Sequence, residues 1–111
     1  MNKKNEFTLY NEIVFLNDYL RQYICNNISI LNRDLKIHLM DESYNLIKNL
    51  ISALYTKGNI KSKYITEMLI NISSIDYLIT IISNYCSINK KHINKSIDIL
   101  SKIKSMTFAW R

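Results

Sequence analysis

Residues 62–86 read SKYITEMLINISSIDYLITIISNYC, and this stretch decides the fold class. Its apolar side chains recur at alternating spacings of three and four residues, which is the periodicity of one helix face. β-Branched isoleucine is not an ideal helix former, but no part of the chain sustains the strict alternation of a strand. The stretch therefore predicts a long helix with one buried stripe, formed by Ile65, Met68, Ile72, Ile75, Ile79 and Ile82.

Similar stripes on both sides of this stretch predict three more helices, over residues 8–26, 32–57 and 89–109. Asn32 is expected to cap the second helix and Gly58 to end it in a left-handed conformation. Ile88 and Ile93 have the spacing of a hydrophobic staple at the start of the last helix. The predicted stripes are Leu9, Ile13, Leu16, Leu20 and Tyr23 in the first helix, Leu35, Leu39, Leu46, Leu50 and Leu54 in the second, widened by Ile47 and Ile51, and Ile93, Ile97, Leu100, Ile103 and Trp110 in the last.

Short connections between four helices predict one all-α domain over residues 1–111, folded as an antiparallel up-down-up-down four-helix bundle. The chain has no proline and only one glycine, and both residue types interrupt helices. Hydrophobic residues make up 48% of the chain, which argues against a disordered protein.

The first residues, MNKKNEF, lack the apolar run of a secretory signal, and purely apolar stretches are too short for a membrane span. We therefore expect a cytoplasmic protein without a membrane partner. In that compartment Cys25 and Cys86 are expected to be reduced thiols, with a disulfide between them as the alternative.

Motifs that would carry catalysis or bind a cofactor are missing from the sequence. His38 and His92 lie on different predicted helices, and no Cys-x-x-Cys, His-x-x-x-His or Glu-x-x-His motif occurs. One glycine cannot form a glycine-rich phosphate loop. We therefore expect that the protein is not an enzyme and that it binds no metal and no cofactor. We expect His92 to have an exposed polar role.

Charge is distributed unevenly along the chain, whose net charge is +6. Residues 1–56 carry six basic and six acidic side chains, whereas residues 57–111 carry nine basic and three acidic ones. Such asymmetry points to an anionic partner, and nucleic acid bound with weak sequence specificity is the hypothesis. Its candidate binding residues are Lys57, Lys61, Lys63, Lys90, Lys91, Lys95, Lys102, Lys104 and Arg111.

Within this set, Lys91, Lys95 and Lys102 fall within roughly 40° of one another on a helical projection of the last helix. They point away from Leu100 and Ile103 and have only Asp98 nearby. The alternative is that this stripe is simply a solvated helix face.

Eight tyrosines are many for this length, and two interpretations of them stay open. They could lie at the edge of the core with their hydroxyl groups in water, or they could form an interface, where tyrosine is enriched. The second interpretation predicts a homo-oligomer.

The C-terminal part of the chain resembles a known family of four-helix bundles. Ile88-Asn89-Lys90-Lys91 opens a helix that closes with Ile103-x-x-Met106-x-x-x-Trp110. This pattern resembles the accessory variability determinant of diversity-generating retroelements and the proteins encoded in 23S rRNA intervening sequences. The resemblance covers residues 34–111, and the chain departs from the family pattern in having Thr80 where an arginine is common and Lys104, Phe108 and Ala109 where small glycines are usual.

The resemblance implies properties that the residues alone do not. Retroelement members form a barrel-like pentamer with a basic surface, bind nucleic acid and the retroelement reverse transcriptase, and support mutagenic cDNA synthesis. It thus implies a non-catalytic accessory protein with a reverse transcriptase as partner. The alternative is a structural or protein-interaction bundle of the intervening-sequence type, with no role in nucleic-acid binding.

Overall fold

The computed structural model describes residues 2–111, and these residues form four packed helices without a strand. The helices are α1 (Lys3–Tyr19), α2 (Arg33–Leu54), α3 (Gly58–Tyr85) and α4 (Lys90–Trp110). The prediction of an all-α fold with four helices is confirmed. The molecule is elongated, measuring 43 × 22 × 17 Å along its principal axes.

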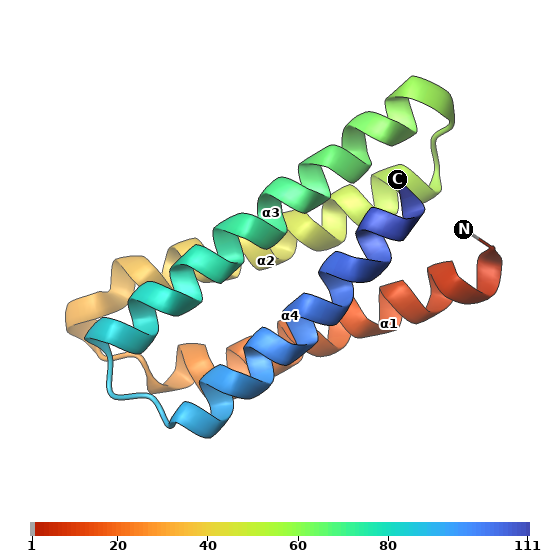
Figure 1. Cartoon of the computed structure of the whole chain (residues 1–111). Helices are drawn as coiled ribbons and strands as arrows, with labels where there is room; N and C mark the ends of the chain where they lie inside the picture. The colour runs from red at the N-terminus through yellow and green to blue at the C-terminus, as the bar shows by residue number, and fades with distance from the viewer. Residues whose placement is uncertain (1) are drawn as a thin grey trace.

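Each helix packs against the helices that precede and follow it, and α4 also packs against α1, which closes a ring. In Figure 1 the α1–α2 and α3–α4 connections lie at one end of the molecule. The α2–α3 connection and both termini lie at the other end.

The predicted stripes of α1 and α3 are buried in the core, including the fully buried side chains of Leu9, Ile13 and Ile75. On α2 the stripe is narrower than predicted, because Ile51 and Leu54 are exposed. On α4 the stripe is turned slightly toward α1. The buried apolar residues there are Ile93, Ile99, Leu100, Ile103 and Trp110, whereas Ile97 is only partly buried.

The first helix differs from its predicted bounds at both ends. It begins earlier because the Asn2 side chain accepts a hydrogen bond from the Asn5 backbone N–H, at 2.9 Å, and so caps the first turn. After Tyr19 the helix widens into a π-helical segment, Leu20–Ile24, followed by short 3₁₀ turns at Cys25–Asn27 and Ile30–Asn32.

Two predicted caps at the ends of α2 also need correction. Asn32 occupies the N-cap position of α2, but its side chain makes no capping hydrogen bond. Gly58 has the expected left-handed backbone, with φ of +61°, but it opens α3 and does not end α2, which stops at Leu54. At the start of α4 the Asn89 side chain does cap the helix by accepting from the Lys91 backbone N–H.

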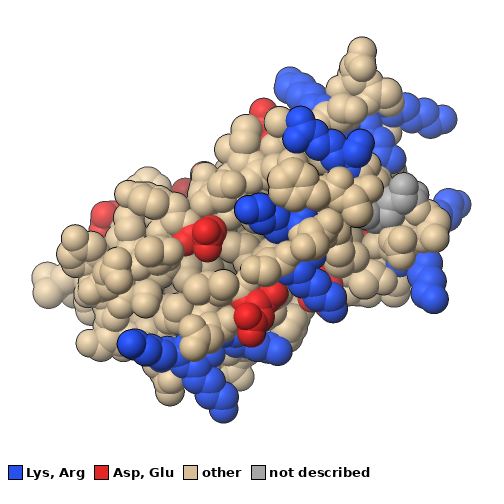
Figure 2. Space-filling view, in the orientation of Figure 1, with Lys and Arg blue, Asp and Glu red and all other residues tan. Residues whose placement is uncertain are grey.

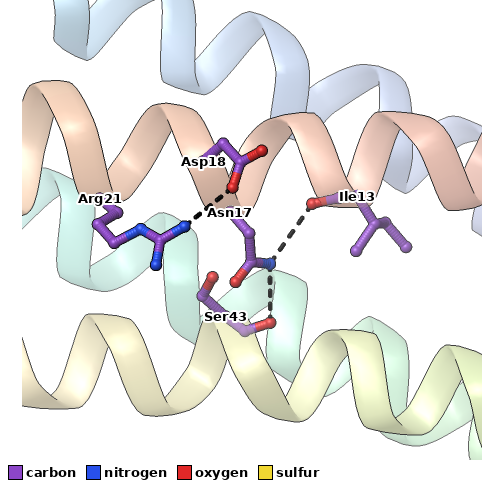
Figure 3. A network of polar contacts seen from close by, with 5 residues as sticks. All are labelled: Ile13, Asn17, Asp18, Arg21 and Ser43. Carbon is purple, nitrogen blue, oxygen red and sulfur yellow. Dashed lines mark hydrogen bonds and ion pairs between the residues drawn. The ribbon is translucent and has the colours of Figure 1, made fainter.

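Polar side chains also join the helices. The Asn17 amide of α1 donates to the Ser43 backbone carbonyl of α2 at 3.0 Å and to the Ile13 carbonyl of its own helix at 3.4 Å (Figure 3). Between α2 and α3, the buried Asn71 amide donates to Glu42 at 3.0 Å and accepts from Asn49 at 2.7 Å. These bonds satisfy amide groups that would be costly to bury unpaired.

Mean hydropathy sets α3 apart from the other described helices. By length and composition alone it could cross a membrane, since its most apolar 18-residue window has a mean hydropathy of 1.5. Within the bundle, 44% of that window is buried, and the buried residues of α3 are the predicted stripe together with Asn71 and Leu78. Core burial therefore accounts for part of the apolar composition of α3, whereas Ile70 and Tyr77 of the same helix are exposed.

Replacing Gly58 tests the α2–α3 connection. A Cβ at this position would meet no atom within 4 Å, so the backbone conformation alone opposes a side chain. We expect Gly58→Ala to lower the free energy of unfolding by about 1–2 kcal/mol. Gly58→Asn should cost less, because asparagine tolerates the left-handed region. Thermal unfolding followed by circular dichroism measures both, and equal stability of the alanine variant and wild type would contradict this account.

Candidate nucleic-acid interface

The lysines of α4 divide between its two exposed flanks. Lys91, Lys95 and Lys102 lie on the flank toward α1, as the ion pair between Lys102 and Glu12 of α1 shows. Lys90 and Lys104 lie on the flank toward α3, where each lines a shallow hollow between α3 and α4. The predicted stripe therefore exists, but it is only one of two lysine rows on this helix.

Lys102 differs from the other two members of the predicted stripe. Its ammonium group lies 2.8 Å from Glu12 Oε1, so Asp98 is not the only acidic group near the stripe. Exposed pairs of this kind contribute at most about 1 kcal/mol to stability. The pairing nevertheless reduces the charge that Lys102 offers to a phosphate.

A second basic group lies at the other end of the molecule. Lys57 and Lys63 are exposed around the α2–α3 connection, and Arg111 is exposed at the end of α4. Lys61 lies over the Trp110 ring, with Nζ 5.0 Å from the centroid, in a cation–π contact that joins the start of α3 to the end of α4.

The nine candidate residues do not form one continuous patch. Lys90 and Arg111 stand at opposite ends of α4, about 30 Å apart at 1.5 Å per residue. Figure 2 shows basic side chains gathered at the end that holds the termini and again over the start of α4, with acidic and a few further basic side chains between them.

Most of these basic groups are not neutralised by neighbours. Among residues 2–111, only Lys102 of the nine has a carboxylate within 4.0 Å of its charged group. Eight of the nine cations therefore have no carboxylate partner, and of these Lys61 is engaged with the Trp110 ring.

An aromatic cluster on the α1–α4 seam was missed by sequence analysis. The Tyr19 hydroxyl lies 3.1 Å from His92 Nδ1, and the Tyr23 ring stacks on the His92 ring with centroids 4.7 Å apart. Burial and the neighbouring Tyr23 raise the pKa of Tyr19. The expectation of an exposed His92 is corrected, since it is partly buried. The sequence signal for this cluster was the four-residue spacing of Tyr19 and Tyr23, which places both rings on the same side of a helix.

The outer face of α3 carries a different surface, an open groove between α2 and the end of α4. Ile70 is 53% exposed and Phe108 is 52% exposed there, while His38, Glu42 and Arg111 lie around them. Aromatic and aliphatic residues within a polar rim are typical of protein–protein contacts. The full lining is His38, Glu42, Thr66, Leu69, Ile70, Ser73, Ser74, Tyr77, Leu78, Phe108 and Arg111.

The cysteines, histidines and carboxylates are spread over the bundle. Across residues 2–111, no three His, Cys, Asp or Glu side chains are placed to hold a metal ion. Both cysteines are free thiols. Burial raises the pKa of the Cys25 thiol to about 11, with a smaller opposing effect of Lys36, and burial and Asp34 raise the pKa of Cys86.

Comparisons with known proteins do not identify the chain. No family model matches it, and neither a curated protein nor a solved structure matches it either.

Thiol chemistry offers a check on the packing around Cys25. We expect an aromatic disulfide reagent at about pH 8 to modify Cys86 well before Cys25, because buried, protonated thiols are poor nucleophiles. Cys25→Ser and Cys86→Ser variants each leave one thiol, so the two rates are measured separately.

The same pKa shift has a consequence for stability. A thiol with a raised folded-state pKa stabilises the fold below its ordinary pKa of 9.0, and this contribution is lost as the pH rises toward about 11.

In the modification experiment, equal rates for the two single-thiol variants would contradict the burial of Cys25.

Proposed function

We propose that this protein is a non-catalytic accessory protein that binds nucleic acid through its basic surface and assists a reverse transcriptase in a diversity-generating retroelement. The observation that carries the nucleic-acid part is the set of eight basic side chains without a carboxylate partner. Phosphate binding by lysine and arginine needs such unpaired cations. No recognised base-reading motif accompanies them, so binding is weakly sequence-specific.

The family resemblance supports the remaining parts of the proposal. The reverse transcriptase partner and the preference for a pentamer rest on the resemblance of residues 34–111, whereas the cytoplasmic location rests on the absence of a secretory signal in the first residues. The antiparallel up-down-up-down order belongs to the same proposal, and the positions of the three connections in Figure 1 support it.

Nucleic-acid binding is tested by removing charge from each basic group separately. Two triple variants, K90Q/K91Q/K95Q and K57Q/K63Q/R111Q, change one end each and leave the Lys61–Trp110 contact intact. Three lost phosphate contacts should flatten the slope of log affinity against log salt by about 2 for a single strand. Fluorescence anisotropy of a labelled oligonucleotide between about 50 and 200 mM salt measures this slope.

A matched control removes the same charge from the neutral half of the chain. The variant R33Q/K36Q/K48Q lowers the net charge by three on α2 and should change the slope less than either test variant. Circular dichroism checks that every variant is folded. If all three variants bind nucleic acid as tightly as wild type at every salt concentration, the basic residues are only solvated faces and the nucleic-acid role is rejected.

The competing proposal is a structural or protein-interaction bundle without a nucleic-acid role, and the α3 groove favours it. Ile70, Tyr77 and Phe108 present apolar surface to solvent on one face of the bundle. Exposed apolar surface of this kind usually marks an interaction site. Both proposals include a homo-oligomer, so the salt-dependent binding described above separates them.

Self-association through the α3 groove is tested with Ile70→Glu. A buried, unpaired carboxylate at an interface is strongly unfavourable, so this variant should shift an oligomer toward monomer. Ile60→Glu is the control, because Ile60 is exposed on the same helix but does not line the groove. Light scattering over a range of concentrations reports the mass. A monomeric wild type, or an Ile70→Glu variant that assembles like wild type, would contradict this surface.

A further inference from the structure

The α1–α4 seam carries a row of rings, which we call the seam cluster: Phe15, Tyr19, Tyr23 and His92. Neighbouring members lie within ring-contact range, with centroid separations of 6.0 Å for Phe15–Tyr19, 4.6 Å for Tyr19–Tyr23 and 4.7 Å for Tyr23–His92. The row therefore runs without a break from α1 to the first turn of α4.

Phe15 forms the outer end of this row. Its side chain is 46% exposed, whereas Tyr19, Tyr23 and His92 are partly buried. The hydrogen bond between Tyr19 and His92 joins α1 to α4, and the Tyr23 ring stacks on His92 from the π-helical segment Leu20–Ile24. The cluster is thus held in place before any ligand arrives, which lowers the entropic cost of stacking on it.

Cations adjoin the same seam. Lys91 precedes His92, and Lys95 follows it by one helical turn on the exposed flank toward α1. Among residues 2–111, neither ammonium group has a carboxylate within 4.0 Å. Two carboxylates also lie near this site: Glu12, which pairs with Lys102, precedes Phe15 by about one helical turn, and the exposed Asp98 follows Lys95 by three residues on α4.

We propose that the seam cluster is a stacking site for unpaired bases of a single-stranded nucleic acid, with Lys91 and Lys95 binding the adjacent phosphates. Aromatic rings beside lysines are the combination that proteins use for single strands, since every base has a π-face and every nucleotide a phosphate. Bases inside a duplex are stacked on each other and cannot reach such rings. This inference rests on the proposed nucleic-acid role and adds the strand type and the site.

The test uses substitutions at Phe15 that separate stacking from simple apolar contact. Phe15→Leu keeps an apolar side chain but removes the aromatic ring. Phe15→Trp keeps an aromatic ring and makes it larger. The control is Phe7→Leu, the same change on the same helix at a residue that is 67% exposed and outside the cluster. Circular dichroism and thermal unfolding confirm that the four proteins are equally folded.

Binding is measured by anisotropy with labelled single strands of RNA and of DNA and with a duplex of the same length. We expect wild type to prefer single strands and Phe15→Leu to weaken single-strand binding about fivefold or more. Its salt slope should stay unchanged, because no phosphate contact is lost. Phe15→Trp and Phe7→Leu should bind like wild type, and the RNA and DNA arms show which sugar is preferred.

Crosslinking gives an independent readout of position. A single-stranded RNA that contains 4-thiouridine is bound to the protein and irradiated. It should form adducts with the peptides that carry Phe15, Tyr19, Tyr23 or His92. Adducts confined to other peptides would overturn the site.

The outcomes separate this inference from the proposed function. If the lysine variants weaken binding while Phe15→Leu binds like wild type, the stacking site is wrong and the basic surface stands. If duplex binds as well as single strands, the strand preference is wrong. If neither nucleic acid binds at any salt concentration, both proposals are rejected.

Discussion

Burial of the isoleucine stripe on α3 is the interaction on which the rest of the structure depends. Ile75, Ile79 and Ile82 are fully buried, and each such side chain contributes about 1.5–3 kcal/mol relative to exposure. Because α3 packs against both α2 and α4, covering its stripe sets the places of these two neighbours. The α1 helix then closes the ring by packing between α4 and α2.

This arrangement determines which surface residues are near each other. The core face of α4 must meet both α3 and α1, so its lysines remain on two flanks, one beside each neighbour. The seam with α1 brings the rings of Tyr19 and His92 together. The groove on α3 shares no residue with the seam cluster, but it is lined by Arg111, so a protein contact in the groove would cover this one candidate phosphate-binding residue.

Much of the fold was predictable because helical periodicity is a local property of the chain. The stripe from Ile65 to Ile82 indicated α3, and Asn89 and Ile88 indicated the start of α4. Errors occurred where local signals compete. Gly58 was assigned to the end of α2 although it opens α3, because a left-handed glycine is more common after a helix than at its start. The π-helical segment after Tyr19 has no recognised sequence signal.

The sequence by itself determined that there are four helices, most of the residues that they bury and the excess of positive charge in residues 57–111, since each follows from composition or from neighbours within a few turns. Only the tertiary structure decided how that charge is grouped. Glu12 and Lys102 are 90 residues apart in the chain, and Tyr19 and His92 are 73 apart. Their contacts depend on which flank of α4 turns toward α1. Periodicity cannot specify this choice, because it fixes the face that each helix buries but not the helix that lies beside it.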